Sequence, residues 1–261
     1  MDYGIKNKVA LISGGTSGIG FSATQALLNE GVNVVVFSRS KENIDRAKKQ
    51  FIVGDSKLLI LQGDLSNSDS LEKIIKTVND ELGTIDIFVA SSGGPSFGEA
   101  QSLTEDDFNL ALQSNFVSIA TLTNKLLPSM KAQKWGRIVF VTTSGVIQPV
   151  KNLALSNVAR SALVSFAKTL SSEIASEGIT VNSVIPGMIE TTRLKQVIAK
   201  RAKTNGIILN EQLENEYSEI PAKRFGTPQE IANLIVFLCS QGASYVTGSR
   251  IAADGGYIKS Q

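Results

Sequence analysis

The 261-residue chain contains no histidine and a single cysteine. The missing histidine excludes His-based catalytic triads, most zinc sites and the commonest general base, so no metal site is expected. Cys239 follows an apolar stretch and has no partner for an internal disulfide, which predicts a buried thiol in a reducing compartment. No apolar run approaches the roughly 20 residues of a membrane span, and no signal-peptide pattern is found. These absences predict a cytoplasmic protein that binds no membrane.

The sequence also lacks a strong charge bias and a linker. Its formal net charge of +2 is spread along the chain, so we expect no nucleic-acid-binding surface. No Pro-, Gly- or Ser-rich linker and no repeat of solenoid length divides the chain, which is long enough for a large α/β core. These properties predict one domain over residues 1–261 that binds a small diffusible ligand.

Apolar strand-like segments alternate with helix-like segments along the chain. The expected strands are residues 9–12, 32–37, 58–62, 85–90, 137–142, 180–185 and 250–253. The expected helices are residues 21–30, 71–82, 108–130, 152–177 and 228–238. This alternation predicts a Rossmann-like, doubly wound parallel sheet of about seven strands with helices on both faces. Ligands of such sheets bind beyond the carboxyl ends of the strands.

The segment 13–20, Ser-Gly-Gly-Thr-Ser-Gly-Ile-Gly, joins the first expected strand to the first helix. Its glycines allow a sharp turn, close approach of a pyrophosphate and tight helix packing, and the helix N-terminus favours negative charge. The strand before it and the helix after it distinguish the segment from an ordinary glycine-rich turn. It predicts a dinucleotide site with contacts at Ser13, Gly14, Thr16, Ser17, Gly18, Ile19 and Gly20.

The residues after the second strand indicate which dinucleotide is bound. An acidic residue here would bind the ribose hydroxyls of NAD, but the chain has Ser38, Arg39 and Ser40. A guanidinium and two hydroxyls suit a 2′-phosphate, so NADP is favoured over NAD. The alternative is a solvated loop with helix-capping serines. Asp64, after the third strand, either accepts a hydrogen bond from the adenine amino group or caps a turn.

Together these residues resemble the short-chain dehydrogenase/reductase family over essentially the whole chain. Beyond the glycine-rich loop, the resemblance rests on residues 90–93 (Ala-Ser-Ser-Gly, where the family usually has Asn-Asn-Ala-Gly), Asn115, residues 186–191 and the ending 248–256. It implies structural roles for Tyr245 and Asp254. Further cofactor contacts are predicted at Leu65, Ser91, Ser92, Gly93, Pro186, Gly187, Ile189 and Thr191.

The chain departs from this family at the reacting centre. The family uses a serine after the fifth strand, a Tyr-x-x-x-Lys pair on the next helix and an asparagine that holds a relay water. Gap-free alignment places Thr143, Ser156 and Arg160 at the first three positions, and Asn115 is unchanged. Thr143 retains a hydroxyl for a substrate oxygen. Arg160 retains a charge that can bind ribose hydroxyls and stabilise developing negative charge.

Ser156 replaces a phenol with a far weaker acid, so a carbonyl reaction requires another proton source. The candidates are a water held by Asn115 and Arg160, the side chain of Lys151 and that of Tyr217. A solvated lysine and a tyrosine packed within a lid are the alternative interpretations of the last two. Ser156 and Arg160 could also belong to an ordinary helix surface.

Residues 192–220 have a different composition from their surroundings, because basic residues give way to acidic ones. The family places its substrate lid here. Leu194, Val197, Ile198 and Ala202 follow helical spacing, which predicts one packed and one charged face. A solvated amphipathic helix is enough to account for these charges. A basic lid that includes Lys200 and Arg201 could also favour an anionic substrate such as a phosphopantetheine thioester.

The resemblance implies an NADP-dependent oxidoreductase that moves a hydride between the nicotinamide and a carbonyl or secondary alcohol. Its likeness to 3-oxoacyl carrier-protein reductases and sugar dehydrogenases is general and leaves an acyl thioester or a sugar open as substrate. One alternative is a nucleotide-binding sensor that has lost catalysis. Another is a structural subunit of a hetero-oligomer. The family's habit of packing its fourth and fifth helices between subunits predicts a homo-oligomer, either a dimer or a tetramer.

Overall fold

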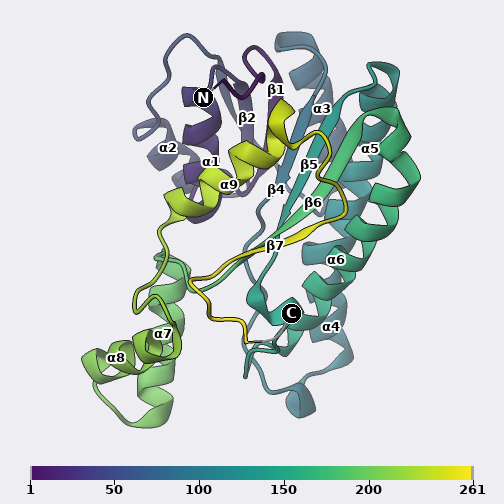
Figure 1. The fold of residues 1–261 in the computed structure, drawn as a ribbon. Coiled ribbons are helices and arrows are strands. Elements are labelled where there is room, and N and C mark those ends of the chain that lie inside the picture. Colours follow the sequence, from purple (N-terminus) through teal and green to yellow (C-terminus); the bar gives the residue numbers. More distant parts are fainter. Residues whose placement is uncertain (1, 260–261) are drawn as a thin grey trace.

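A computed structural model describes residues 2–259, whose central element is a parallel sheet of seven strands (Figure 1). The strand order is β3-β2-β1-β4-β5-β6-β7, and each neighbouring pair is parallel. The strands are β1 (Val9–Ser13), β2 (Asn33–Ser38), β3 (Leu58–Gln62), β4 (Ile87–Ala90), β5 (Gly136–Val141), β6 (Ile179–Pro186) and β7 (Arg250–Ala253). All seven were expected, and their bounds differ from the prediction by at most two residues.

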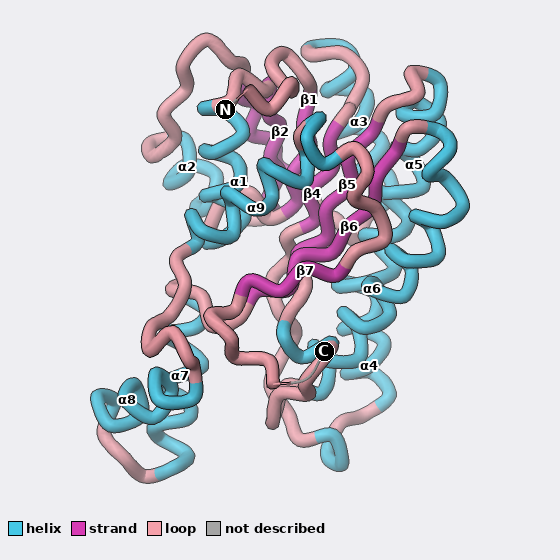
Figure 2. Tube along the Cα trace, in the orientation of Figure 1, coloured by secondary structure: helices cyan, strands magenta, loops and turns pink. Residues whose placement is uncertain are grey.

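Helices cover both faces of the sheet, as the tube drawing also shows (Figure 2). On one face, α1 (Gly18–Asn29) and α9 (Pro228–Cys239) pack against the strands in one large apolar cluster. On the other face, α3 (Ser68–Glu81), α5 (Ser118–Ala132) and α6 (Ala154–Ile174) form the second cluster. The predicted doubly wound fold is therefore confirmed.

The structure adds two helices that the sequence pattern did not predict. Helix α2 (Lys41–Lys48) buries only Ile44 and Ala47, so its apolar periodicity is weak. Helix α8 (Leu209–Glu219) buries the polar residues Gln212 and Glu216, which hides its packed face from a hydropathy pattern. Both helices are short, and tertiary contacts rather than a long apolar stripe stabilise them.

The predicted continuous helix 108–130 is interrupted. It consists of α4 (Glu105–Leu112), a π-helical turn (Gln113–Val117) and α5. The Gln113 carbonyl oxygen accepts the hydrogen bond of this turn from the Ser118 N–H and a second one from the Ser118 hydroxyl at 2.7 Å. Such π-turns are frequent at functional sites, and this one contains the buried residue Asn115.

The order of the strands reverses between β1 and β4, because β2 and β3 lie on one side of β1 and the later strands lie on the other. A parallel sheet opens a crevice at the carboxyl ends of its strands at such a point. Helix α7 (Thr192–Asn205) and α8 project beyond this end of the sheet and pack on each other around Ile198, Ile220 and Phe225 (Figure 1). Within residues 2–259, no helix is both long enough and apolar enough to cross a bilayer.

Candidate active site

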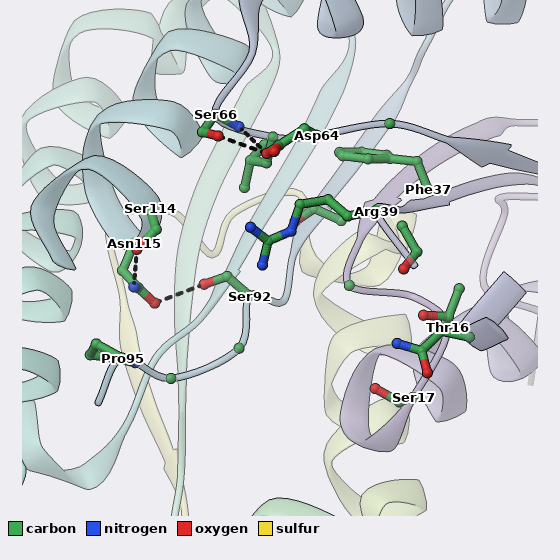
Figure 3. Close-up of a pocket in the computed structure, with 18 residues that line it drawn as sticks. Thr16, Ser17, Phe37, Arg39, Asp64, Ser66, Ser92, Pro95, Ser114 and Asn115 are labelled. Carbon is green, nitrogen blue, oxygen red and sulfur yellow. Dashed lines mark hydrogen bonds between the residues drawn. The ribbon is translucent and has the colours of Figure 1, made fainter. Parts of the chain in front are cut away.

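A cleft of about 340 Å³ lies at this strand-order reversal. The loops after β1, β2, β3 and β4 form most of its wall, and the π-helical turn closes one end (Figure 3). Predicted site residues among its lining are Ser13, Gly14, Thr16, Ser17, Ser38, Arg39, Asp64, Leu65, Ser92, Gly93 and Asn115. Seven further lining residues were not predicted: Phe37, Asn43, Gly63, Ser66, Gly94, Pro95 and Ser114.

The glycine-rich loop passes too close to neighbouring backbone to accept larger residues. A Cβ atom on Gly14, whose φ is +65°, would overlap the carbonyl oxygen of Ser91. A Cβ atom on Gly20 would in turn overlap the carbonyl oxygen of Gly14. Gly18, with φ +53°, brings the start of α1 against Thr191, where a Cβ would lie 3.3 Å from the Thr191 Cγ2 atom. The loop therefore forms a glycine cradle next to the cleft.

The glycine cradle has donors suited to an anion. Helix α1 begins after Ser17, whose side chain makes no capping hydrogen bond to the first turn. The first N–H groups of a helix have no intrahelical acceptor, and they attract a phosphate. The buried Ser13 hydroxyl is also without a protein partner within the described residues. The donor set and the close backbone approach fit the pyrophosphate of a dinucleotide.

The loop after β2 combines both interpretations made from its sequence. The Ser40 hydroxyl accepts a hydrogen bond from the Asn43 N–H at 3.2 Å and caps α2, and the Ser38 hydroxyl accepts from the Ser40 N–H at 3.3 Å. Arg39 is exposed, lines the cleft and makes no ion pair within residues 2–259. Its guanidinium is therefore available to a phosphate group.

Asp64 caps a turn, which was one of its two expected roles. Its Oδ1 atom accepts from the N–H of Ser66 at 2.9 Å and from the Ser66 hydroxyl at 2.7 Å (Figure 3). Burial alone would raise the Asp64 pKa, but the Ser66 hydrogen bonds and the charge of Arg39 outweigh it, so the pKa lies below its usual value. The side chain is an acceptor at neutral pH, and contact with adenine remains a prediction.

Arg160 is buried, with 5 % of its surface exposed, and it binds backbone oxygens. Its Nη1 donates to the Val141 carbonyl at 2.7 Å, at the end of β5, and its Nη2 donates to the Ser92 carbonyl at 2.8 Å, just beyond β4. Burial lowers the Arg160 pKa to about 10, and the charge of Arg193 acts in the same direction. Arg160 thus stays cationic at neutral pH and joins two strand ends, while the predicted contact with ribose remains untested.

Asn115 contacts Arg160 directly. Its Oδ1 accepts from Arg160 Nη2 at 3.3 Å and from the Ser92 hydroxyl at 3.2 Å (Figure 3). Its Nδ2 donates to the Ala111 carbonyl at 3.3 Å and to the Ser114 hydroxyl at 2.8 Å. The structure therefore brings Asn115 and Arg160 into direct contact, and the water that they were predicted to hold stays a prediction.

The two remaining predicted catalytic residues, like Arg160, lie outside the lining of the cleft. Thr143 is half-buried after β5, and its hydroxyl accepts from the Gly145 N–H at 3.4 Å. Ser156 lies on α6, one turn before Arg160, with 8 % of its surface exposed. Both hydroxyls retain a proton that can be donated. Ser156 thus precedes Arg160 by one helical turn, and Thr143 follows Val141, whose carbonyl Arg160 binds, by two residues.

The proton-source candidates on other elements are not brought to this centre. Tyr217 packs on Phe225 inside the lid, with the ring centroids 4.5 Å apart. Lys151 is exposed and lines a separate pocket together with Phe97 and Lys200. The expected lid-packed tyrosine and solvated lysine therefore describe the structure better than acid–base roles.

The residues after β6 separate into two groups. Thr191 lies against Gly18 and caps α7, because its hydroxyl accepts from the Leu194 N–H at 3.2 Å. Ile189, in contrast, is 6 % exposed and packs in the core beneath α9. Pro186 ends β6 and is buried, and Gly187 packs tightly against Asp254.

The two residues for which the family resemblance implied structural roles differ. Asp254 holds a turn by accepting from the N–H groups of Gly256 at 3.0 Å and Ile258 at 2.7 Å. Tyr245 is fully exposed and supports nothing in the single chain. The structural role that the resemblance implied for Tyr245 therefore has no support from contacts of its ring within the described chain.

The fold is that of a Rossmann-like α/β protein, and hydroxyls, an amide and a guanidinium lie at its candidate reacting centre. Residues 14–258 match the family described as enoyl-(acyl carrier protein) reductase. The rabbit (Oryctolagus cuniculus) dehydrogenase/reductase SDR family member 4 is 31% identical over 253 residues, which cover 97% of this chain and 94% of the relative. The chain therefore belongs to the short-chain dehydrogenase/reductase family, an oxidoreductase family.

Two further matches support this assignment. The 3-oxoacyl-[acyl-carrier-protein] reductase FabG of Vibrio harveyi is 31% identical over 254 residues, covering 97% of this chain and 98% of the relative. The solved structure of L-sorbose reductase from Gluconobacter frateurii, complexed with NADPH and L-sorbose, superposes with a TM-score of 0.92 at 30% identity and covers 100% of both chains. The family resemblance seen in the motifs is confirmed.

The bonds of Arg160 predict a stability cost when its side chain is removed. Arg160→Ala should lower the free energy of unfolding by about 2–4 kcal/mol, because it leaves the buried oxygens of Val141 and Ser92 unpaired and creates a cavity. Urea denaturation measures this change. Arg250→Ala removes an exposed arginine and should change the value by no more than about 0.5 kcal/mol. Equal effects of the two substitutions would contradict a structural role for Arg160.

Proposed function

We propose that the protein is an NADP-dependent oxidoreductase that transfers a hydride between the nicotinamide and a small carbonyl or secondary alcohol. The observation that carries the proposal is the glycine cradle beside a cleft whose other end holds Asn115 and Ser92. The unpaired Arg39 favours the 2′-phosphate of NADP. The NADPH and L-sorbose bound to the similar reductase support the same cofactor and substrate class.

Each part of the cleft has a role in this proposal. The glycine cradle and α1 hold the pyrophosphate, Arg39 with Ser38 and Asn43 holds the 2′-phosphate, and Thr191 closes over the loop. Bound NADP supplies or accepts the hydride. Thr143 donates a hydrogen bond to the substrate oxygen. Arg160 is a positioning residue that fixes Ser92 and Asn115 and adds positive potential behind the reacting centre.

The proton has a different origin from that in the wider family. Ser156 is too weak an acid to supply it, and the cationic Arg160 is held by carbonyl oxygens. In the reductive direction, we propose that the hydride forms the new C–H bond while water protonates the substrate oxygen. General acid catalysis contributes about 10²–10⁴ to rate, so the chain should be a slow enzyme for unactivated carbonyls.

A second function is favoured by the same centre. A protein that binds NADP as a regulatory ligand needs the glycine cradle and Arg39 but no phenol. Arg160 donates hydrogen bonds to the Val141 and Ser92 carbonyls. This is compatible with a sensor in which the position of the family's catalytic lysine has a structural role. Turnover distinguishes this sensor from the oxidoreductase.

We also propose a homo-oligomer. Leu110, Val117 and Val158 are exposed to 70%, 40% and 46%, respectively. Leu110 lies on α4 and Val117 on the π-helical turn, and α6, which carries Val158, packs against both of these elements. An exposed apolar face of this kind favours burial against a second subunit. A dimer formed there can assemble further into a tetramer.

A cytoplasmic location is proposed from Cys239. Burial raises the pKa of this thiol to about 12, although the charge of Arg137 opposes the shift. The thiolate is the reactive form of cysteine, so this thiol is inert and suited to a reducing compartment.

Reversing the charge of Arg39 should change cofactor preference. Arg39→Asp removes a charge-assisted contact and places an acid opposite the 2′-phosphate, so the NADPH dissociation constant should rise by about 100-fold. NADH binding should be retained, and titration calorimetry measures both constants. Lys73→Asp, an equal charge reversal on the exposed face of α3, is the control. An unchanged ratio of the two constants in Arg39→Asp would contradict the NADP assignment.

Restoring a phenol should accelerate carbonyl reduction. Ser156→Tyr should raise NADPH oxidation with a ketose or a 3-oxoacyl thioester by about tenfold or more, because it adds a general acid beside a cation. Ser156→Ala should stay within about twofold of the wild type, because water supplies the proton in both. A large loss in Ser156→Ala would instead identify Ser156 as the donor. NADPH binding without turnover on any carbonyl would favour the sensor.

A charge placed on the exposed apolar face should dissociate the oligomer. Val158→Glu introduces a carboxylate that subunit contact would have to desolvate, so sedimentation should show a smaller assembly than the wild type. Thr169→Glu adds the same charge on an exposed α6 position further along the helix and serves as the control. A wild-type chain that sediments as a monomer would overturn the proposal.

A further inference from the structure

Arg193 contacts one residue that lines the cleft and one that lines a second pocket. It is the second residue of α7, and its Nη2 donates to the carbonyl of Pro95, which lines the cleft, at 2.8 Å. The guanidinium also stacks on the ring of Phe97, with its Cζ 4.0 Å from the ring centroid. Phe97 lines the second pocket, of about 390 Å³, on the other side. A group bound by Arg193 would therefore lie beside both spaces.

The positive charge of Arg193 lies in an electrostatically unfavourable position. The first turn of a helix carries positive partial charge, so a cation there is destabilising. Burial also lowers the pKa of Arg193, and its charge contributes to the lowered pKa of the buried Arg160. Within residues 2–259, no acid forms an ion pair with either arginine. A bound anion would relieve each of these costs.

The nearby charges separate into neutralised and free ones. Arg201 makes a bidentate contact with Glu216 at 2.8 and 2.7 Å, so its charge is compensated inside the lid. Lys200 lies 4.9 Å from the centroid of the same Phe97 ring, and Lys151 lines the pocket across from α7. Neither lysine has an ion-pair partner among the described residues.

The pocket also contains one acid and several apolar groups. Glu99 lies at its exposed rim and accepts a hydrogen bond from the Gln101 side chain at 3.1 Å. The ring of Phe97 and the side chains of Leu153 and Val197 form apolar walls. Free cations beside apolar walls suit a ligand that has a compact anionic end and a hydrophobic body.

We propose that Arg193, backed by Lys200 and Lys151, binds the carboxylate of the substrate, so that the natural substrate is an organic acid with an apolar or aromatic body. The Arg193 guanidinium has five N–H donors, of which one is used by Pro95, and its planar edge matches a carboxylate. This assignment rests on the proposed function only in taking the bound acid to be the molecule that is reduced or oxidised.

Titration calorimetry with benzoate and its neutral isostere benzamide tests the site, both with saturating NADP⁺ and with the free protein. Benzoate should bind at least about tenfold more tightly than benzamide, because one charge-assisted hydrogen-bonded pair separates them. Arg193→Gln should abolish that difference and leave NADP⁺ affinity unchanged. Arg193→Lys, which keeps the charge without the planar fork, should restore part of it.

Lys203→Gln is the matched control, since it removes one exposed charge from the same helix and should leave benzoate binding intact. Equal binding of benzoate and benzamide, or a loss in Lys203→Gln as large as that in Arg193→Gln, would overturn the carboxylate site. Tighter binding of phenyl phosphate than of benzoate would overturn the choice of carboxylate. Failure to bind NADP⁺ would contradict the proposed function alone, because the measurement on the free protein still reports on Arg193.

Discussion

The close approach of the glycine cradle to the end of β4 is the constraint on which the rest of the site depends. Gly14 lies so near the Ser91 carbonyl that only glycine fits, and a Cβ atom on Gly20 would likewise overlap the Gly14 carbonyl. This contact brings the loop after β1 and the loop after β4 together at the point where strand order reverses. It also places the start of α1 beside the cleft, which Ser17 lines. The phosphate binding that we propose is thus a consequence of how the first and fourth strands are joined.

Arg160 extends the same constraint to β5. A lysine ammonium has three donors at one point, whereas a guanidinium presents five donors across a plane and needs acceptors on more than one side. Here the carbonyls of Val141 and Ser92 and the amide oxygen of Asn115 meet that need. A guanidinium held in this way releases no proton at neutral pH, and Ser156 beside it offers no phenol whose pKa the charge could lower. The two substitutions are physically consistent with each other, because both move the centre from proton transfer toward fixed electrostatics.

Sequence predicted the fold more completely than the site. The seven strands are near-continuous apolar runs, which locate buried parallel strands well, whereas α8 was missed because it buries Gln212 and Glu216. The glycine cradle and Arg39 were predictable because their chemistry depends on local backbone and position. The partners of Arg160 were not, since a long side chain bonds to whichever carbonyls the tertiary fold leaves free. Arg193 was counted in the basic lid, but only the structure separates it from the neutralised Arg201.

The lid therefore has a different electrostatic character from the one its composition indicates. Where acidic and basic side chains of the lid form ion pairs, as Arg201 and Glu216 do, their charges largely cancel and produce little net electric field. The charge of Arg193 is not compensated by an ion pair within residues 2–259, because the first turn of α7 directs this side chain away from the lid interior and onto Pro95 and Phe97. An unpaired charge in a partly desolvated position has a stronger local effect than several solvated ones, since screening by water is weaker there. In the proposed function, selection among substrates thus depends mainly on Arg193 at the start of α7, with Lys200 and Lys151 beside the same pocket, while the cleft binds the nucleotide.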